Sequence, residues 1–360
     1  MLSRADSKRP FGSFTRPVWL GEELASMGHE VTHFCPEPPH LVRSDVHYRR
    51  YALPSDIRGV VVSGGSVVNL LSLSQLRADI LYIHELANTG FVAARVLHLL
   101  PIVLDAHSSE AMELRSYGKR DRADKAHLAE TMSLHFADMI IAASHELRDY
   151  LISEYGLPPE RCHVVQNGVP ARAVTDPPCG TGWREKLRLA SDELLVLHAA
   201  PDQFESNDLS LDFMEECAKA ASSKRLSLRM LVCGRNDAPV GIQAIGVVDD
   251  YYGLVDACDI ALLPYPPRAV CGGARNKSLE FMARSKAIVS TKEGVRGIPD
   301  AISGTHYLRA DSPEEVVTSI ESLAANPELR RNLGVSARQL AGRYTWSQSA
   351  RALERVFHEV

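Results

Sequence analysis

The chain has 360 residues, of which 45% are hydrophobic and 24% are charged, and its formal net charge is −5. This length predicts two domains of ordinary size, and the composition is typical of a globular protein. The net negative charge argues against a nucleic-acid partner. No apolar run has the length of a membrane span or of a signal peptide's core, so we expect a soluble protein.

Seven cysteines are scattered along the chain without C-x-x-C or metal-ligand spacing. This pattern predicts reduced thiols and a cytoplasmic protein. The most basic stretch, residues 115–125, is interrupted by Asp121 and Asp124. It is typical of a solvated helix, and peripheral contact with the inner face of a membrane stays open as the lesser alternative.

The first half of the chain alternates short apolar runs with helical patterns. Residues 1–3 resemble the end of a first strand, and a helix is predicted over residues 15–27, with Pro17 in its first turn and Gly28 at its end. Further strands are predicted at residues 31–34, 60–62, 80–83, 102–104, 139–142 and 163–165, and further helices at 67–77, 87–99, 127–136 and 145–155. This alternation predicts a parallel, doubly wound sheet.

Ligands of such sheets bind beyond the carboxyl ends of the strands. The residues predicted there are Gly12, Ser13, His84, Glu85, Asp105, His107, Ser144, Asn167 and Gly168. Asp105 fits a structural role as well as a catalytic one, whereas Asn167 and Gly168 are typical of a turn. Glu130 and His135 are expected on a helix surface.

Residues 170–182 are rich in turn-forming residues and predict an interdomain linker. A second α/β series follows. Its predicted strands are 194–198, 227–233, 242–247, 260–263, 287–290 and 306–308, and its predicted helices are 209–222, 251–257, 275–284, 313–325, 327–342 and 346–359. The sequence therefore predicts two similar α/β lobes that face each other across a cleft.

One stretch of the second series, residues 260–299, combines a strand, a Gly-Gly loop and a helix. On a helical wheel, Asn276, Lys277, Glu280 and Arg284 fall within an arc of roughly 100°. Such an arc is commonly the solvated face of an amphipathic helix. A helix N-terminus behind a glycine loop is also an anion site, where a lysine and a carboxylate suit a nucleotide's diphosphate and ribose.

Several motifs, in this order and spacing, resemble glycosyltransferase family 4 of the GT-B fold. The second half contains G-G-A-R-N-K-S-L-E-F-M-A-R-S-K-A-I-V-S-T (residues 272–291), V-C-G-R (232–235) and D-A-C-D-I-A-L-L-P (256–264). The first half contains G-H-E-V-T (28–32), A-D-M-I-I-A-A-S (137–144) and V-V-Q-N-G-V (164–169). Y-T-W-S (344–347) resembles the entry to a last helix that crosses back to the first lobe.

The resemblance implies a domain organisation and specific roles. Residues 1–170 would form an acceptor-side Rossmann-like domain, 171–182 a linker, 183–345 the donor domain and 346–360 the returning helix. Glu280 would bind the nucleotide's ribose, Lys277 the diphosphate, and His107 in L-D-A-H the donor sugar near the reacting carbon. Gly12 and Ser13 would lie near diphosphate and acceptor. The other implied donor-binding residues are Gly234, Arg235, Gly272, Gly273, Ala274, Arg275, Asn276 and Ser278.

This sequence departs from the family's pattern at two positions. Gly272 stands where the family often has a glutamate that touches the donor sugar, and Asn207 stands about where a diphosphate-binding lysine is expected. Some relatives tolerate a G-G-x-x-x-K-x-x-E loop, so activity is still expected. The departures bear on donor affinity and on the identity of the sugar.

The resemblance implies a retaining, metal-independent glycosyltransferase of the hexosyltransferase kind that acts in glycan, polysaccharide or glycolipid synthesis. Its substrates would be a nucleotide-diphosphate sugar and a hydroxyl acceptor, which could be a saccharide, a lipid-linked intermediate or a small molecule. No cofactor and no bound metal are expected. Two alternatives stay open: a nucleotide-sugar epimerase that uses the same fold, and a non-catalytic protein that binds a sugar nucleotide or a partner.

Overall fold

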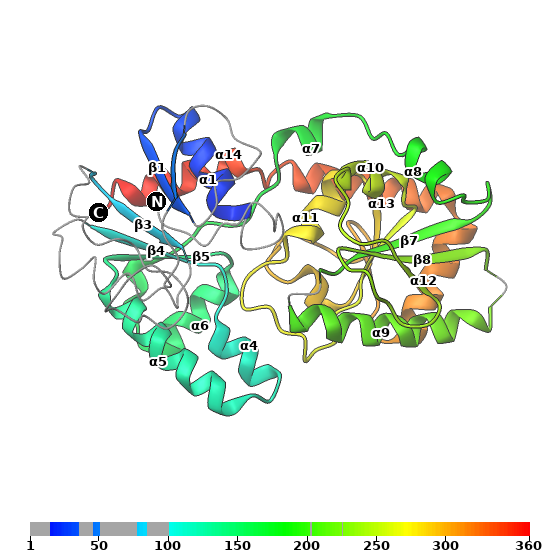
Figure 1. Cartoon of the computed structure of the whole chain (residues 1–360), viewed down its shortest axis with the longest axis horizontal. Helices are drawn as coiled ribbons and strands as arrows, with labels where there is room; N and C mark the ends of the chain where they lie inside the picture. Colours follow the sequence, from blue (N-terminus) through cyan, green and yellow to red (C-terminus); the bar gives the residue numbers. More distant parts are fainter. Residues whose placement is uncertain (1–14, 36–45, 51–77, 85–100, 202–203, 225) are drawn as a thin grey trace. The chain divides into compact units, whose positions relative to one another are not determined.

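A computed structural model describes residues 15–35, 46–50, 78–84, 101–201, 204–224 and 226–360. The chain divides into two compact units. The first unit comprises Met1–Asn167, Gly272–Ala274 and Trp346–Val360, and the second comprises Gly168–Cys271 and Arg275–Thr345. Each unit contains parallel strands with helices (Figure 1), which confirms the predicted α/β class. The elements predicted at 1–3, 60–62, 67–77 and 87–99 lie outside the described residues.

The described part of the first unit contains a four-stranded parallel sheet in the order β3-β4-β5-β6 and a separate parallel pair, β1-β2. Its strands are β1 (Val31–Cys35), β2 (Val46–Arg50), β3 (Leu81–His84), β4 (Ile102–Ala106), β5 (Met139–Ala142) and β6 (Cys162–Val164). Its helices are α1 (Thr15–Ser26), α4 (Glu110–Ser116), α5 (Arg120–Phe136), α6 (His145–Tyr155), the 3-10 helix η3 (Pro159–Arg161) and α14 (Trp346–Phe357).

Alternate residues of these strands pack into different cores. Ile102 and Leu104 of β4 belong to a core with α5 and α6, whereas Val103 between them packs with α1 and α14. Trp346 and Leu353 place α14 in this second core beside Leu20 of α1. The last helix therefore belongs to the first unit, as the sequence predicted.

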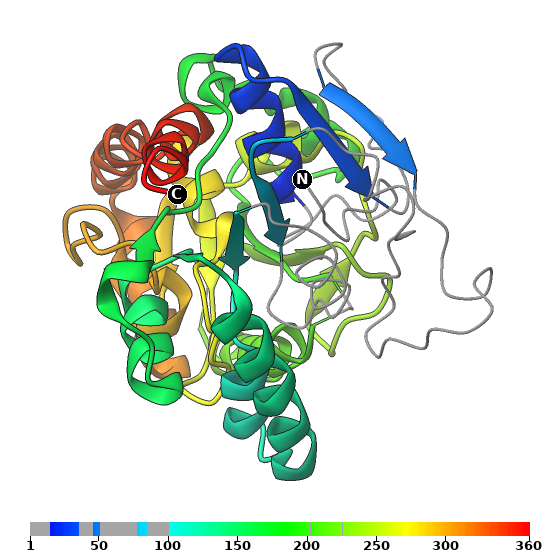
Figure 2. The same ribbon diagram turned by 90° about the vertical axis from the view of Figure 1, so that its left-hand side faces the viewer.

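The stretch 115–125 is not one solvated helix, because α4 and α5 are separate helices that lie side by side (Figure 1, Figure 2). Gly118 adopts a φ of 77° in the turn between them, a conformation that glycine takes at little cost. Ser109 caps α4 by accepting a hydrogen bond from the backbone N–H of Met112. The sequence analysis did not predict α4 or β2.

The second unit contains a six-stranded parallel sheet in the order β12-β11-β10-β7-β8-β9. Its strands are β7 (Leu194–Ala199), β8 (Leu228–Cys233), β9 (Ile242–Ala244), β10 (Ile260–Leu263), β11 (Ala287–Ser290) and β12 (Leu308–Arg309). Its helices are α7 (Ala171–Thr175), α8 (Thr181–Lys186), α9 (Glu205–Ser222), α10 (Tyr251–Ala257), α11 (Asn276–Ala283), η4 (Lys292–Val295), α12 (Pro313–Ala325) and α13 (Pro327–Ala341).

This sheet is covered on both faces (Figure 1). Leu195 and Leu197 of β7 pack in a core with residues of α10 and α11, whereas Val196 packs in another with residues of α9 and α12. The strand order reverses between β7 and β10, which run side by side in the middle of the sheet. A doubly wound sheet binds its ligand at such a reversal, beyond the carboxyl ends of the strands.

The segment predicted as a linker is partly helical. It contains α7 and the first residues of α8. Arg338 of α13 donates through Nε to the carbonyl oxygen of Val174 at 2.6 Å, and Arg284 donates through Nη1 to that of Ala173 at 3.1 Å. Two side chains that are more than 100 residues away in the sequence thus bind α7 to the rest of the second unit. Among the described helices, none combines the length and apolarity needed to cross a bilayer.

Candidate functional site

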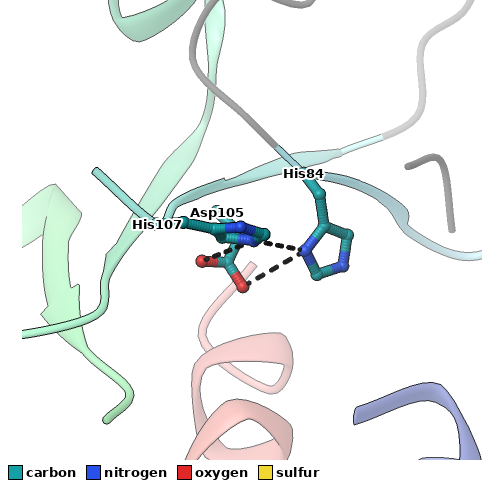
Figure 3. Close-up of side chains that lie close together, drawn as sticks. All are labelled: His84, Asp105 and His107. Atoms are coloured by element: carbon teal, nitrogen blue, oxygen red, sulfur yellow. Dashed lines mark hydrogen bonds and ion pairs between the residues drawn. The ribbon is translucent and has the colours of Figure 1, made fainter. Parts of the chain in front are cut away.

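Two histidines meet at the end of the first unit's sheet. Strands β3 and β4 pair with His84 opposite Asp105, and His107 follows β4 directly. Nδ1 of His84 lies 2.9 Å from Nε2 of His107, so the N–H of one ring donates a hydrogen bond to the nitrogen of the other (Figure 3). The Asp105 carboxylate lies just below this contact, 3.6 Å from Nδ1 of His84 and 3.8 Å from Nε2 of His107.

The charge of Asp105 is balanced by a buried arginine. Arg16 of α1 donates through Nε to both carboxylate oxygens, at 3.1 and 3.0 Å, and Tyr82 of β3 donates its hydroxyl to Oδ2. The Arg16 and Asp105 side chains are 1% and 0% exposed. Because its charge is balanced and both oxygens are bonded, Asp105 is suited to fixing its neighbours rather than to accepting a substrate proton.

Burial keeps both histidines neutral at pH 7. It lowers the pKa of His107 to about 4, although the nearby Asp105 opposes the shift. Burial, followed by the charge of His107, lowers the pKa of His84 well below its usual range. Nε2 of His84 and Nδ1 of His107 are buried and have no hydrogen-bond partner among the described residues. His107 can therefore offer a neutral imidazole nitrogen to a polar ligand.

The same three residues carry ligand atoms that lie within 4.8 Å of one another, as in a metal site. A divalent cation here would face the guanidinium of Arg16, which already engages both oxygens of Asp105. Like charges in a buried site repel strongly. The arrangement therefore fits a proton shared between two imidazoles better than a metal ion.

The glycine loop predicted to bind the donor makes close backbone contacts within the first unit. A Cβ atom at Gly273 would lie 1.7 Å from the carbonyl oxygen of His107, and one at Gly272 would lie 2.5 Å from the backbone nitrogen of Ser109. The next residue, Ala274, accepts a hydrogen bond from Nδ2 of Asn167 at 3.1 Å. Only glycine at positions 272 and 273 allows the two backbone segments to lie this close without a backbone shift. Gly12 and Ser13 lie outside the described residues.

From the sequence, Glu130 is expected on the surface of its helix. That expectation is wrong, since the residue is 1% exposed. It accepts hydrogen bonds from the Ser109 hydroxyl at 2.8 Å, the backbone N–H of Ala111 at 3.1 Å and the Tyr155 hydroxyl. Burial raises the pKa of Glu130, and these hydrogen bonds oppose the shift. The carboxylate is buried because it fastens the start of α4 to α5. His135 is exposed, as expected.

In the second unit, Lys277 lies at the reversal of strand order. Its ammonium donates to the carbonyl oxygen of Ala199 at 2.5 Å, to Oδ1 of Asn207 at 3.1 Å and to the hydroxyl of Tyr265 at 2.6 Å. Ala199 ends β7, and Tyr265 comes two residues after β10. Lys277, the residue predicted to bind the diphosphate, is therefore held at the edge where a doubly wound sheet binds its ligands. We call Lys277, Asn207 and Tyr265 the lysine cluster.

Arg275 immediately precedes α11 and stacks on the lysine cluster. Its guanidinium carbon lies 3.4 Å from the centre of the Tyr265 ring. It donates to the carbonyl oxygens of Ala269 at 2.5 Å and Glu293 at 3.2 Å, and the residue is 7% exposed. These contacts give Arg275 a structural role in addition to its positive charge.

Glu280 lies one helical turn after Lys277 on α11. Burial raises its pKa to about 6, and the Tyr251 hydroxyl and the charge of Lys277 act in the opposite direction. A carboxylate held in a poorly hydrated place, beside a cation, is common at functional sites. The carboxylate is a hydrogen-bond acceptor, as the hydroxyls of a ribose require.

The structure places the other predicted donor-binding residues in different surroundings. Gly234 has a φ of 96° where β8 ends, and Arg235 pairs with Asp208 at 2.8 Å and Asp237 at 3.1 Å. Ser278 is fully buried and donates its hydroxyl to the carbonyl oxygen of Gly294 at 2.6 Å. Ser278 thus contributes to the packing of α11, and Asn276 lies half-buried in the first turn of that helix.

Sequence reasoning missed three members of these arrangements. Arg16 and Tyr82 are 89 and 23 residues from the Asp105 that they bind. Tyr265 is 12 residues from Lys277. Its position just beyond a predicted strand, between two prolines, was a usable signal for a ligand-side residue.

Comparisons with known proteins agree with this architecture. The family model described as Glycosyltransferase Family 4 matches residues 18–172, and the model described as Glycosyl transferases group 1 matches residues 204–326. The chain is 23% identical over 323 residues to D-inositol 3-phosphate glycosyltransferase of Corynebacterium diphtheriae, which covers 81% of this chain and 73% of the relative.

Solved structures show the same fold. A glycosyltransferase of Rickettsia africae has a TM-score of 0.74 at 14% identity, covering 99% of this chain and 97% of its own. HepE of Anabaena, solved in complex with UDP-glucose, also has a TM-score of 0.74 at 14% identity, covering 100% and 98%. The fold and the family models together define a glycosyltransferase of the GT-B class. The chain belongs to glycosyltransferase family 4.

Proposed function

We propose that this glycosyltransferase moves a sugar from a nucleoside-diphosphate sugar to a hydroxyl acceptor, with retention of configuration and without a metal ion. The observation that carries the proposal is the position of Lys277, whose ammonium lies where β7 and β10 end and the strand order reverses. A solved relative, HepE, binds UDP-glucose. The C. diphtheriae relative is a D-inositol 3-phosphate glycosyltransferase. The first name agrees with a nucleotide-sugar donor, and the second agrees with an acceptor that carries hydroxyl groups.

The chemistry of the side chains assigns a role to each. Negative charge develops on the departing diphosphate, and pre-placed positive charge stabilises it in the transition state. Lys277 and the N-terminal end of α11 supply that charge. The carboxylate of Glu280 accepts hydrogen bonds from the ribose, and the neutral imidazole of His107 bonds a hydroxyl of the donor sugar. Removing one such donor costs about 3–4 kcal/mol of barrier, or roughly a factor of 10²–10³ in kcat.

The balance of charges supports a mechanism without a metal. In the first unit, Arg16 donates hydrogen bonds to both oxygens of Asp105 and balances its charge. In the second unit, the charge for the diphosphate comes from a lysine. We assign binding of the nucleotide to the second unit and binding of the acceptor to the first, and we place the reaction in glycan or glycolipid synthesis in the cytoplasm or at the inner face of a membrane.

Calorimetric titration and turnover assays test the proposal. The wild-type protein is titrated with UDP, GDP and ADP and with the matching nucleosides, and Lys277→Met and Glu280→Ala are titrated in parallel. Lys277→Met is expected to weaken diphosphate binding by at least tenfold and to leave nucleoside binding unchanged, whereas Glu280→Ala weakens both. Unchanged diphosphate affinity in both variants would overturn the proposal.

Turnover separates the proposal from its rivals. A glycosyltransferase consumes the nucleotide sugar that binds best only when a hydroxyl acceptor is present, and the glycosidic product keeps the anomeric configuration of the donor. Conversion without any acceptor would instead identify an epimerase. Tight binding without turnover against a broad acceptor panel would identify a sugar-nucleotide-binding protein.

A further inference from the structure

The ammonium of Lys277 is fixed by groups that do not neutralise it. Its three N–H bonds have three acceptors, the Ala199 carbonyl, the Asn207 amide oxygen and the Tyr265 hydroxyl. All three acceptors are uncharged. The lysine therefore has a defined position, and no anionic acceptor takes any of its three N–H bonds.

The hydrogen bonds around Tyr265 have a fixed direction. Because its hydroxyl oxygen accepts from Lys277, its own proton is donated to Oδ1 of Asn207, at 3.0 Å. The amide group of Asn207 in turn donates through Nδ2 to the carbonyl oxygen of Pro201, at 2.8 Å. This sets the orientation of the Asn207 amide, so its oxygen must face the lysine. The side chains of Lys277, Tyr265 and Asn207 thus form one network of hydrogen bonds.

Packing and hydrogen bonds hold the Tyr265 ring in place within this network. The residue is 0% exposed, and the guanidinium of Arg275 covers one face of the ring at 3.4 Å. Its backbone carbonyl accepts a hydrogen bond from the Thr291 hydroxyl at 2.6 Å. A rigid phenol at this point holds the lysine side chain, whose flexible four-carbon stem would otherwise sample many rotamers.

Asn207 makes this arrangement compatible with the charge of Lys277. Its Oδ1 lies 3.1 Å from Nζ of Lys277. A cationic side chain at position 207 would place two like charges close together in a buried place, which is strongly unfavourable. The neutral amide instead turns the site into one with a single, firmly held ammonium group.

We propose that Tyr265, oriented by Asn207, is the positioning residue that aims the Lys277 ammonium at the diphosphate of the donor. This inference rests on the proposed function, because it assumes that Lys277 binds that diphosphate. Tyr265 acts through Lys277 and touches no reacting atom. Its contribution is therefore specific for the diphosphate and disappears when the lysine is removed.

A double-mutant cycle tests this dependence. Wild type, Tyr265→Phe, Lys277→Met and the double variant are titrated with UDP, GDP and ADP and with the matching nucleosides. Tyr265→Phe keeps the ring and its contact with Arg275, and is expected to weaken diphosphate binding roughly tenfold without changing nucleoside binding. In the Lys277→Met background the same substitution is expected to change neither affinity. Tyr344→Phe, which removes a tyrosine hydroxyl that donates to Asp300 at 2.8 Å in the same unit, is the control.

Asn207→Asp provides a second, nearly isosteric variant that places a carboxylate against the ammonium. It is expected to weaken diphosphate binding at least tenfold and to leave nucleoside binding intact. Equal losses from Tyr265→Phe with and without Lys277, or an unchanged affinity in Asn207→Asp, would overturn the inference alone. If the wild-type protein binds no nucleoside diphosphate, the proposed function fails, and the inference fails with it.

Discussion

Arg16 and Asp105 form an ion pair in the interior of the first unit, in which the single N–H at Nε of the arginine is shared between the two carboxylate oxygens at 3.1 and 3.0 Å. The same guanidinium donates to Oδ1 of Asn167 and to the carbonyl oxygen of Val165, each at 2.8 Å. One side chain thereby ties α1 to β4 and to the segment after β6. Its positive charge also adds to the effect of burial, which lowers the pKa of both histidines.

Replacing Arg16 by Gln is expected to lower the free energy of unfolding by about 3–5 kcal/mol, because Asp105 would be left buried without its cation. Urea unfolding of the variant measures the loss. Arg351→Gln, at an exposed position of α14, is the control and should change stability by less than about 0.5 kcal/mol. A loss below about 1 kcal/mol for Arg16→Gln would show that Asp105 does not depend on this arginine.

His107 should remain neutral throughout the physiological range of pH, because burial lowers its pKa to about 4. Nitrogen-15 NMR of the imidazole should therefore show no titration between pH 8 and pH 5. The unfolded chain binds a proton near pH 6.5, whereas the folded protein does not. The contribution of His107 to stability is accordingly complete above pH 6.5 and is lost as the pH falls toward 4.

A His107 resonance that titrates between pH 8 and pH 5 would contradict the buried, neutral pair.

Glu280 should destabilise the folded protein at neutral pH, since burial raises its pKa from 4.5 to about 6. Between those values the folded state binds more protons than the unfolded state, so this contribution to stability falls as the pH rises through that window. Glu280→Gln is therefore expected to raise the free energy of unfolding at pH 7 by roughly 1 kcal/mol, after allowance for its partial exposure.

Urea unfolding at pH 4.5 and pH 7 separates this effect from an ordinary gain in packing, because the stabilisation should appear only at the higher pH. Glu185→Gln, at an exposed position of α8, should show no such difference. Equal stability of Glu280→Gln and wild type at pH 7 would count against the raised pKa.

Gly334 of α13 allows two backbones to approach closely, since a Cβ atom there would lie 2.1 Å from the carbonyl oxygen of Ser285. Gly334→Ala is expected to destabilise the protein by about 3 kcal/mol, because backbone must move to relieve the overlap. Gly182 of α8 has open space around the same atom, and Gly182→Ala should stabilise the protein by about 0.5–1 kcal/mol. Thermal unfolding with the same sign for both variants would refute the packing argument.

The elements that the sequence predicted best are those with strong local signals. The predicted bounds of α6, α10, α12, β10 and β11 coincide with those in the structure, because apolar runs or apolar periodicity end there at glycine, proline or a capping residue. The strand β2 has the sequence V-H-Y-R-R and forms by pairing with β1. The short helix α4 depends on Ser109 and Glu130. No local sequence pattern predicts the contact with Glu130.

The site residues were predictable to the extent that they follow strands or begin a helix. His107 and Lys277 could be located in this way, since the carboxyl ends of parallel strands are known from the strand pattern alone. Their partners could not, because the pairing of Lys277 with Asn207, 70 residues away, follows from the order of the strands. In the sequence Asn207 stands out only as a departure from a family pattern, whereas the structure gives it a hydrogen-bonding role.

The position of α14 has a consequence for how the chain acquires its structure during synthesis. Trp346, Leu353 and Val356 complete a core that begins with Leu20 and Leu24 of α1, so this core of the first unit can close only after the ribosome has passed residue 357. The second unit can bury its own two cores in the meantime. Although domains commonly fold in the order of their synthesis, we expect the lobe that is made later to mature first here, with the earlier lobe exposed to chaperones and proteases until then.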